Sequence, residues 1–244
     1  MKKVLFLLVC VMALASCRVN INGGFGTQIE PSKNIVKKDY KLASFDEVVV
    51  RAVSNVMLIQ DSVKSGVVEF SAPENYVELF DFNSHNGELG INFTQNNVNI
   101  EQEHVIVKVF TSRLKKIRNI GASNVALDGF QTDCLVVENS GVGNFNLANL
   151  KTNSLEVKCS GVGNIMLNGQ TKDAHYGCSG VGSIHAKDMK AEKVEARVTG
   201  VGNIDCYASE SIDGKVTGVG SLKYAGSPQH KSLKANFTGN ISEI

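Results

Sequence analysis

Ser160-Gly-Val-Gly-Asn-Ile165 is one of five near-identical hexapeptides that follow one another through the second half of the chain. Successive copies are 20, 19, 20 and 18 residues apart, and the other four begin at Ser140, Ser179, Thr199 and Thr217. Weaker copies lie upstream at Gly121–Val125 and downstream at Thr238–Ile241. A nearly constant period of this size is typical of a solenoid, in which each repeat contacts only its neighbours.

Each repeat reads as two short strands separated by turns. Leu155, Val157 and Cys159 alternate with Glu156 and Lys158, which is the period of two expected for a strand with one buried face. A second strand follows the motif, with these predicted inward positions: Phe145, Ile165, Ile184, Ile204 and Leu222. Since crossovers between parallel strands are right-handed, we expect an all-β, right-handed parallel β-helix of 18–20 residues per coil.

The regular spacing of the motif along the chain predicts structural roles for two sets of residues. Glycines are expected at the corners of the coil because a sharp bend needs a residue with positive φ: Gly141, Gly143, Gly161, Gly163, Gly180, Gly182, Gly200, Gly202, Gly218 and Gly220. An Asn/Ser column is expected to stack and to bond along the solenoid axis: Asn124, Asn144, Asn164, Ser183, Asn203 and Ser221. The valine between the glycines is expected to face the core.

The N-terminus predicts export. Met1-Lys-Lys3 is basic, and the apolar run Val4–Ala15 is too short for a stable membrane span. The sequence Leu14-Ala-Ser-Cys17 resembles the lipobox of bacterial lipoproteins, which implies a signal peptide over 1–16 and lipidation of Cys17. The alternative is an ordinary signal peptide with a chance cysteine.

A lipid-anchored chain of this kind would be held in the cell envelope by its acyl chains alone. Arg18 directly after the cysteine favours the outer membrane over the inner, while the periplasmic or surface face stays open. Residues 17–42 carry little periodicity and are expected to be a tether.

Net charge and cysteine spacing argue against a nucleic-acid-binding protein and against a zinc protein. Without residues 1–16 the chain has 23 basic and 24 acidic residues, so electrostatics gives no reason to expect nucleic acid binding. Cys159 and Cys178 share one column of adjacent coils, where parallel side chains suit disulfide geometry poorly, and we expect them to be buried apolar fillers. No Cys/His spacing predicts zinc.

The first half of the chain is less regular. Residues 43–118 are expected to form irregular coils of the same solenoid, followed by regular coils over 119–241. Val53–Ile59 reads as a degenerate first copy of the motif, and Pro73–Gly87 as a longer excursion. A separate small sandwich packed on the coils is the alternative.

The repeated Gly-Val-Gly-Asn-Ile motif, the segment Asn86–Ile91 and the segment Leu114–Ile117 together resemble the head GIN family of auto-transporter adhesins, which are Bacteroidetes lipoproteins. The resemblance covers residues 43–241. It implies a right-handed β-helix similar to pectin-lyase folds, without evident catalytic residues, and a role in adhesion.

Three other functions would each need particular residues in the repeats. A dinucleotide-binding loop needs a third glycine, and these positions instead hold Asn146, Met166, His185, Asp205 and Lys223. Calcium-binding β-rolls need an aspartate column, which is absent. A polysaccharide-active lyase or hydrolase would use outward carboxylates, and the candidates are Glu138, Glu156 and Glu195, beside Lys158 and Arg197.

We therefore expect a non-catalytic, lipid-anchored envelope protein that binds a glycan or another envelope protein, with no cofactor and no metal. The polysaccharide-active enzyme on the same scaffold is the alternative. Exposed strand edges at the solenoid ends, or the sheet faces, could support oligomers.

Overall fold

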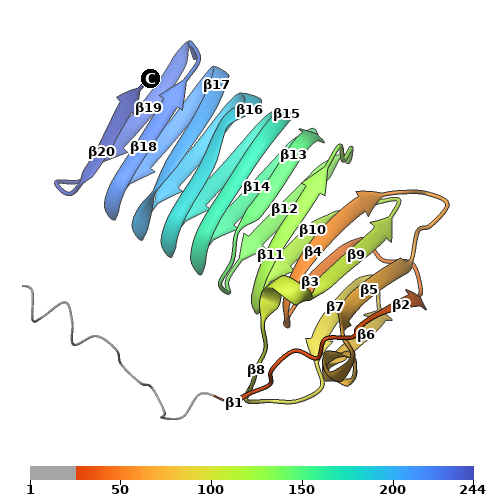
Figure 1. Cartoon of the computed structure of the whole chain (residues 1–244). Coiled ribbons are helices and arrows are strands. Elements are labelled where there is room, and N and C mark those ends of the chain that lie inside the picture. The colour runs from red at the N-terminus through yellow and green to blue at the C-terminus, as the bar shows by residue number, and fades with distance from the viewer. Residues whose placement is uncertain (1–25) are drawn as a thin grey trace, which may run out of the picture.

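The computed structural model describes residues 26–244, which form a parallel β-solenoid of about six turns (Figure 1). The described part of the chain is nearly all β, and its only helices are two short 3-10 helices, η1 (Glu74–Leu79) and η2 (Gln102–His104). Neither is long and apolar enough to cross a membrane. The predictions of an all-β chain and of a solenoid are confirmed.

The regular coils stack as parallel strands in matched register. Leu135, Leu155 and Ala174, for example, occupy one column on three successive coils. The strands of this region are β10 (Lys116–Asn119), β11 (Ala122–Asp128), β12 (Cys134–Asn139), β13 (Phe145–Lys151), β14 (Ser154–Cys159), β15 (Val162–Cys178), β16 (Val181–Val198), β17 (Val201–Val216) and β18 (Val219–Ala225).

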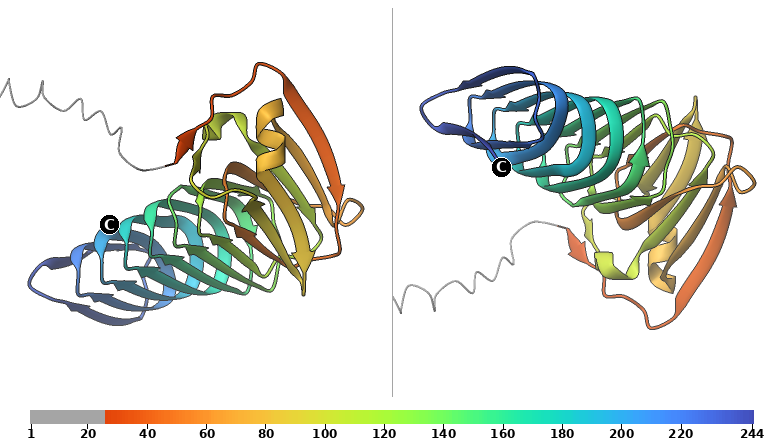
Figure 2. Two further views of the ribbon diagram at one scale, coloured as in Figure 1. Left: turned by 90° about the horizontal axis from the view of Figure 1, so that it is seen from below. Right: turned by 90° about the horizontal axis from the view of Figure 1, so that it is seen from above.

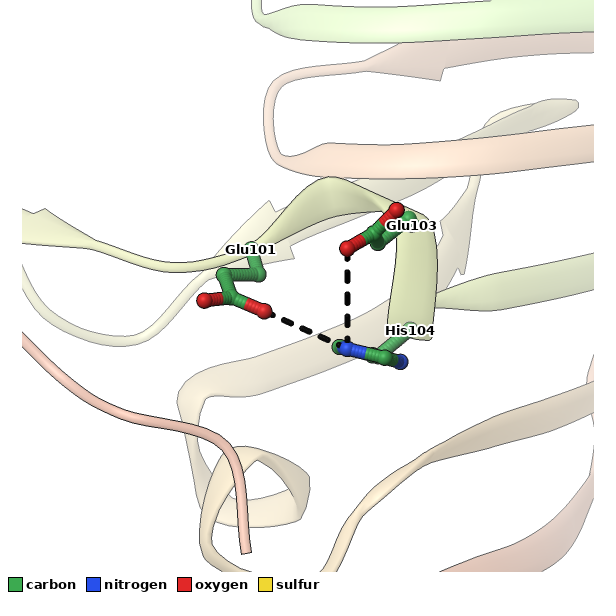
Figure 3. A group of neighbouring side chains, drawn as sticks. All are labelled: Glu101, Glu103 and His104. Carbon is green, nitrogen blue, oxygen red and sulfur yellow. Dashed lines mark ion pairs between the residues drawn. The ribbon is translucent and has the colours of Figure 1, made fainter.

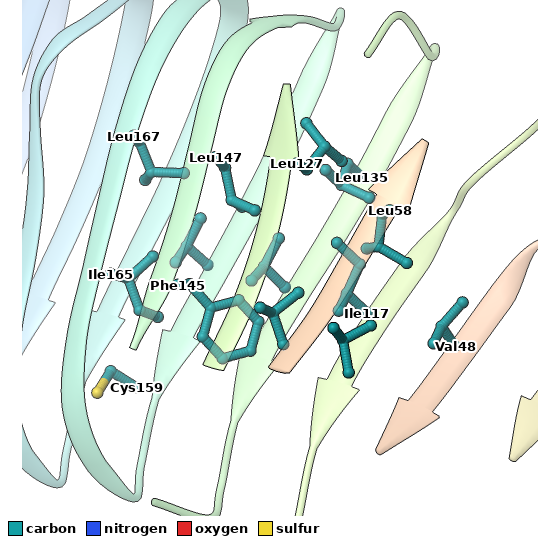
Figure 4. Packing of buried hydrophobic residues seen from close by; sticks show 14 of the residues in the cluster. Val48, Leu58, Ile117, Leu127, Leu135, Phe145, Leu147, Cys159, Ile165 and Leu167 are labelled. Atoms are coloured by element: carbon teal, nitrogen blue, oxygen red, sulfur yellow. The ribbon is translucent and has the colours of Figure 1, made fainter. Parts of the chain in front are cut away.

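The core lies between the two main sheets of the solenoid. Phe145 and Leu147 of β13 and Ile165 of β15 project into it and are fully buried (Figure 4). From the facing sheet come Leu155, Val157 and Cys159 of β14, also fully buried. Alternation of apolar and polar residues therefore places one side of each strand in the core, as the sequence predicts.

The strands of the later coils are longer than expected. β15, β16 and β17 have 17, 18 and 16 residues, so each runs through one sheet, around a corner and into the other sheet. Pairing persists around that corner, where Gly169, Gln170 and Thr171 of β15 keep register partners on β16. Register shifts occur at the bend, between Met166 and Asn168 of β15 and between Ala186 and Lys190 of β16.

The corner at the hexapeptide differs from the expected arrangement in one respect. The valine between the glycines faces solvent: Val142, Val162, Val181, Val201 and Val219 are all exposed. The alternation of the preceding strand continues through the motif, so that Cys159 and Ile165 face inward while Val162 faces outward. The expectation that this valine faces the core was wrong.

The glycines of the motif are required mainly by close approach of neighbouring coils. A β-carbon on Gly161 would overlap the carbonyl oxygen of Gly141, and one on Gly163 would overlap that of Gly143. Positive φ adds a second requirement at Gly143 and Gly163, where φ is 142° and 136°. Gly161 has no positive φ, so at this position stacking alone excludes a side chain.

The N-terminal part of the solenoid is stacked out of sequence order. β3 (Glu47–Val50) lies between β7 (Glu88–Phe93) and β10, and β4 (Val53–Gln60) lies between β9 (Ile106–Thr111) and β11. Val53 and Asn55 are register partners of Ala122 and Asn124, in agreement with a degenerate motif copy here. The irregular coils are thus part of the same solenoid.

An antiparallel cap closes this end of the molecule, opposite the C-terminus (Figures 1 and 2). β5 (Val67–Pro73) pairs antiparallel with β9, β6 (Phe80–His85) with β7, and β2 (Ile35–Lys41) with β5. Phe70, Phe80, Phe82, Phe93 and Tyr40 pack together inside the cap, with ring centroids 4.8–5.0 Å apart in the closest pairs.

This cap corrects two details of the sequence interpretation. The segment expected to be a tether contains β2, because Val36 and Tyr40 pack against the core while their strand covers the edge of β5. The excursion Pro73–Gly87 contains η1 and β6 rather than a coil. A further short pair, β1 (Thr27–Gln28) with β8 (Val98–Asn99), joins the start of the described chain to the loop before η2.

The C-terminal coil consists of β19 (His230–Ala235) and β20 (Gly239–Glu243), which pair with β17 and β18. Glu243 accepts hydrogen bonds from Lys231 Nζ and Tyr224 Oη, both at 2.9 Å. Most of β19 is exposed, so polar contacts rather than a deep core hold this last coil.

Candidate binding groove

An open groove of about 910 Å³ follows the corner opposite the hexapeptide, where the chain passes from the second strand of one coil to the first strand of the next. Its walls come from several successive coils, and its lining residues are Arg113, Lys115, Gln131, Thr132, Asp133, Cys134, Lys151, Thr152, Asn153, Gln170, Thr171, Lys172 and Glu192. The groove therefore crosses several coils.

Register fixes the positions of the exposed side chains in the groove. Gln131 pairs with Lys151, and Lys151 pairs with Gln170, so three long polar side chains stand on successive coils. Neighbouring strands are about 4.8 Å apart, which sets the spacing of these groups. The result is a row of hydrogen-bonding groups repeated once per coil.

A threonine follows each of these residues and fixes the turn from inside. The hydroxyls of Thr132, Thr152 and Thr171 donate to carbonyl oxygens of the preceding coil, at 2.8, 2.9 and 3.2 Å. The acceptors are Leu114, Asp133 and Asn153. The carbonyls of Asp133 and Asn153 also accept backbone N–H bonds, from Ser154 and Asp173, so each threonine adds a side-chain bond between neighbouring coils at the floor of the groove.

The groove carries an excess of positive charge. Four cations line it against two carboxylates, Asp133 and Glu192. Lys115 forms an ion pair with Asp46, whereas Arg113, Lys151 and Lys172 have no ion-pair partner among residues 26–244. Asp133 accepts a hydrogen bond from Asn153 Nδ2 at 3.3 Å. Three unpaired cations in a concave surface attract anions.

The outer face of the neighbouring sheet is different, because its charges pair with each other. Glu138 lies 3.2 Å from Lys116 and 3.4 Å from Arg118, and Glu195 lies 3.1 Å from Arg197. Lys158 pairs with Glu156. The carboxylates on which the enzyme interpretation relied are thus held by cations, and this geometry favours the charged-face interpretation over an acid–base pair.

His175 and His185 also have partners on this solenoid. His175 Nδ1 lies 3.2 Å from Glu195 Oε2, and His185 Nδ1 lies 2.7 Å from Asp205 Oδ1. Both imidazoles are exposed, on the outer faces of different sheets. They contribute nothing to the groove.

The side chains of Glu101, Glu103 and His104 gather beside η2 (Figure 3). His104 Nε2 lies 3.2 Å from Glu101 and 3.8 Å from Glu103, so two carboxylates and one imidazole could offer ligands to a cation. The sequence analysis did not single out this cluster, although its signal is the short motif Glu-Gln-Glu-His. The side chains are exposed or half-buried, and both carboxylates lie within ion-pair distance of the imidazole.

The Asn/Ser column lies beside the valines and bonds along the axis. The side-chain oxygens of Asn124 and Asn144 accept from the backbone N–H of Asn144 and Asn164, at 3.0 and 2.9 Å. Asn164 accepts in the same way from Ser183, and Asn203 from Ser221. Asn55 heads the column and was missed, although it stands in the degenerate motif copy.

The sequence predicts the lipid anchor at Cys17, but the groove was missed. The signal for the groove is a second repeated tripeptide: Gln131-Thr-Asp133, Lys151-Thr-Asn153 and Gln170-Thr-Lys172. Cys17 and the predicted signal peptide lie outside the described residues. Cys159 and Cys178 are free and buried, in agreement with their prediction as fillers. Cys206 is also free and buried, and Cys134 is exposed.

Comparison with known proteins gives a family match. Residues 44–228 match the family model described as "Putative auto-transporter adhesin, head GIN domain". No curated protein matches the chain.

Solved structures give a consistent result. A crystal structure of a putative adhesin from Bacteroides fragilis shares 34% identity, covers 88% of this chain and all of its own, and has a TM-score of 0.85. A putative lipid binding protein from Parabacteroides distasonis and a putative adhesin from Parabacteroides merdae each share 20% identity. Their TM-scores are 0.68 and 0.60. Each match covers 89% of this chain, and it covers 100% of the first protein and 99% of the second. At this identity the last two support the fold alone.

Proposed function

Because the chain belongs to the family of putative auto-transporter adhesins with a head GIN domain, we propose that it is a non-catalytic adhesin of the cell envelope whose groove binds an anionic glycan. The solenoid would act as a rigid rod that presents the groove along its side. Fold alone does not establish a function, so the proposal rests on the chemistry of the groove.

One observation carries this proposal: within the described part of the chain, Arg113, Lys151 and Lys172 stand in the groove without ion-pair partners, whereas the glutamates of the adjacent sheet face are paired with cations. Carboxylate or sulfate groups of a polymer can take the place of those partners. Gln131, Gln170 and other neutral groups of the lining add donors and acceptors for sugar hydroxyls. Because these groups repeat with the coils, a chain lying along the solenoid axis fits better than a compact ligand.

We further propose that lipidation of Cys17 anchors the mature chain in the outer membrane. Eight residues separate Cys17 from Gly26, where the described chain begins, which gives a short link between acyl chains and fold. Two or more acyl chains provide stable anchoring without a transmembrane helix. The anchor and the groove are independent parts of the proposal.

The binding proposal can be tested with the mature chain carrying Cys17→Ser and immobilised polygalacturonate, with dextran as the neutral comparison. We expect binding to polygalacturonate only, and weaker binding at higher salt because exposed charges are screened. Lys151→Glu with Lys172→Glu should lower affinity about tenfold or more, equivalent to about 1.4 kcal/mol.

The matched control is Lys215→Glu with Lys234→Glu, which changes net charge equally but lies on an exposed sheet face outside the groove. It should leave affinity within about twofold, a change of less than about 0.5 kcal/mol. Equal loss in both double variants would show non-specific attraction and contradict the groove proposal. Release of shortened or unsaturated sugar products would instead support the enzyme alternative.

A further inference from the structure

The corner formed by the hexapeptides carries an exposed ladder of valines. Each member is about half exposed, between 49% and 57%: Val142, Val162, Val181, Val201 and Val219. Each valine is the register partner of the next one along the stack. Five strands at about 4.8 Å spacing make a continuous apolar ridge roughly 19 Å long.

The surroundings of this ridge are uncharged. A glycine column lies on either side of it, followed by the Asn/Ser column on one side and a hydroxyl column on the other: Ser140, Ser160, Ser179, Thr199 and Thr217. We call this strip of five hexapeptides the valine band. None of its residues is ionisable, although charged residues are abundant on both sheet faces.

Folding of the solenoid does not require the valines. The glycines on either side are fixed by close approach of the coils, whereas Val162 and its counterparts point outward, where polar side chains would be accommodated. A contiguous exposed apolar surface of this kind marks an interaction site. The band also lies at the opposite corner of each coil from the groove, so it can be covered while the groove stays open.

We propose that the valine band is the surface through which two copies of this chain associate side by side. Two such bands can meet without burying an unpaired charge, which would be costly. The valines of one copy have the same spacing as the valines of the other, because both follow the coil spacing. The ridge is flanked by short, uncharged side chains, so the ridges of two copies can lie against each other as in a dry interface between stacked sheets.

A pair of this kind has twofold symmetry, with the same surface used by both copies. Five half-exposed valines provide less than the roughly 800 Å² per partner of a standard stable interface. We therefore expect a weak dimer in solution. Anchoring both copies in one membrane would raise their effective concentration and favour the pair.

The test is sedimentation of the mature chain carrying Cys17→Ser and Cys134→Ser, over a range of concentrations up to the high micromolar. We expect a reversible monomer–dimer equilibrium that Val162→Lys with Val201→Lys shifts to monomer, by about tenfold or more in dissociation constant. Both positions are exposed, and thermal unfolding should show that the variant is folded. Met166→Lys, which is similarly exposed but outside the band, is the matched control and should leave the dimer intact.

Disulfide cross-linking tests the proposal even if the dimer is too weak to be seen by sedimentation. Val181 is the third of the five valines, so Val181→Cys should form a disulfide between two copies under mild oxidation, while Met166→Cys should not. A monomer at every concentration together with no cross-link at residue 181 would overturn the proposal. A dimer that persists in the double lysine variant would overturn it too.

Discussion

The glycine columns show how single residues determine the spacing of the coils. Gly161 and Gly163 lie against the carbonyl oxygens of Gly141 and Gly143, so a methyl group at either position would force two coils apart. Gly177, which is in β15 together with Gly163, offers a comparison: a β-carbon there would have its nearest neighbours at 3.9 Å, which is ordinary van der Waals contact. Glycine is thus needed at some positions of the solenoid and not at others.

Gly161→Ala should therefore destabilise the fold by about 3 kcal/mol or more, because the overlap involves backbone that cannot move aside. Gly177→Ala should change stability by less than about 0.5 kcal/mol, the range of exposed substitutions. Denaturant unfolding of both variants measures the difference. Equal stability of the two variants would refute the steric role of the glycine columns.

Tyr176 illustrates a different residue-level effect. Its side chain is buried between the sheets, burial raises the pKa of its phenol, and its hydroxyl has no hydrogen-bond partner among residues 26–244. Tyr176→Phe removes an unsatisfied polar group and leaves the ring in place. We expect the variant to be more stable by about 1 kcal/mol. A loss of stability in denaturant unfolding would instead reveal a partner for the hydroxyl.

Among the elements, the terminal coils differ most from the repeat. β19 and β20 have few buried residues, and the contacts of Glu243 with Lys231 and Tyr224 tie the two strands to β18. The hydrogen bond from Lys231, followed by that from Tyr224, lowers the pKa of Glu243 below its ordinary value of 4.5. Such a depressed pKa means that the ionised carboxylate stabilises the folded coil.

The stabilisation by Glu243 should be complete above pH 4.5 and should be lost as the pH falls through the lowered pKa. Glu243→Gln should therefore weaken the terminal coil at neutral pH but make little difference in acid. Nuclear magnetic resonance can follow both the carboxyl titration and the amides of β20. Lys231→Ala should move the pKa of Glu243 back toward 4.5, and an unchanged titration in that variant would contradict the assigned cause.

The regular elements follow from the sequence because each coil repeats the environment of the one before it. Leu155, Val157 and Cys159 could be placed in the core from alternation alone, and the Asn column from the register of the motif. The outward direction of Val162 was also encoded, since alternation continues through the motif. It was missed because the corner was assumed to interrupt that alternation.

The irregular elements could not be placed in this way. β7 and β9 stack beyond β3 and β4, although they follow them in the chain, and β2 joins the sheet by antiparallel pairing with β5. Such non-local pairings leave no periodic signal. The groove was hidden for a related reason: Gln131, Lys151 and Gln170 look like ordinary turn residues until stacking brings them into one row.

The molecule as a whole is a rod with a cationic groove at one corner of its coils and an uncharged valine band at the other. The cap closes the N-terminal end of the rod, and β1, the first strand of the described chain, lies beside it (Figure 1). A rod anchored by this end would extend its regular coils, with the groove, away from the membrane. We therefore propose that the protein works as a lipid-anchored adhesin outside the cell.

The most direct test is protease treatment of intact native cells, with an antibody against the solenoid and a periplasmic protein as the marker of an unbroken envelope. The account predicts that the solenoid is lost while the marker survives, and that a Cys17→Ala variant is no longer retained by the membrane. Full protection of the solenoid until the envelope is opened would place it in the periplasm and contradict the role as an adhesin.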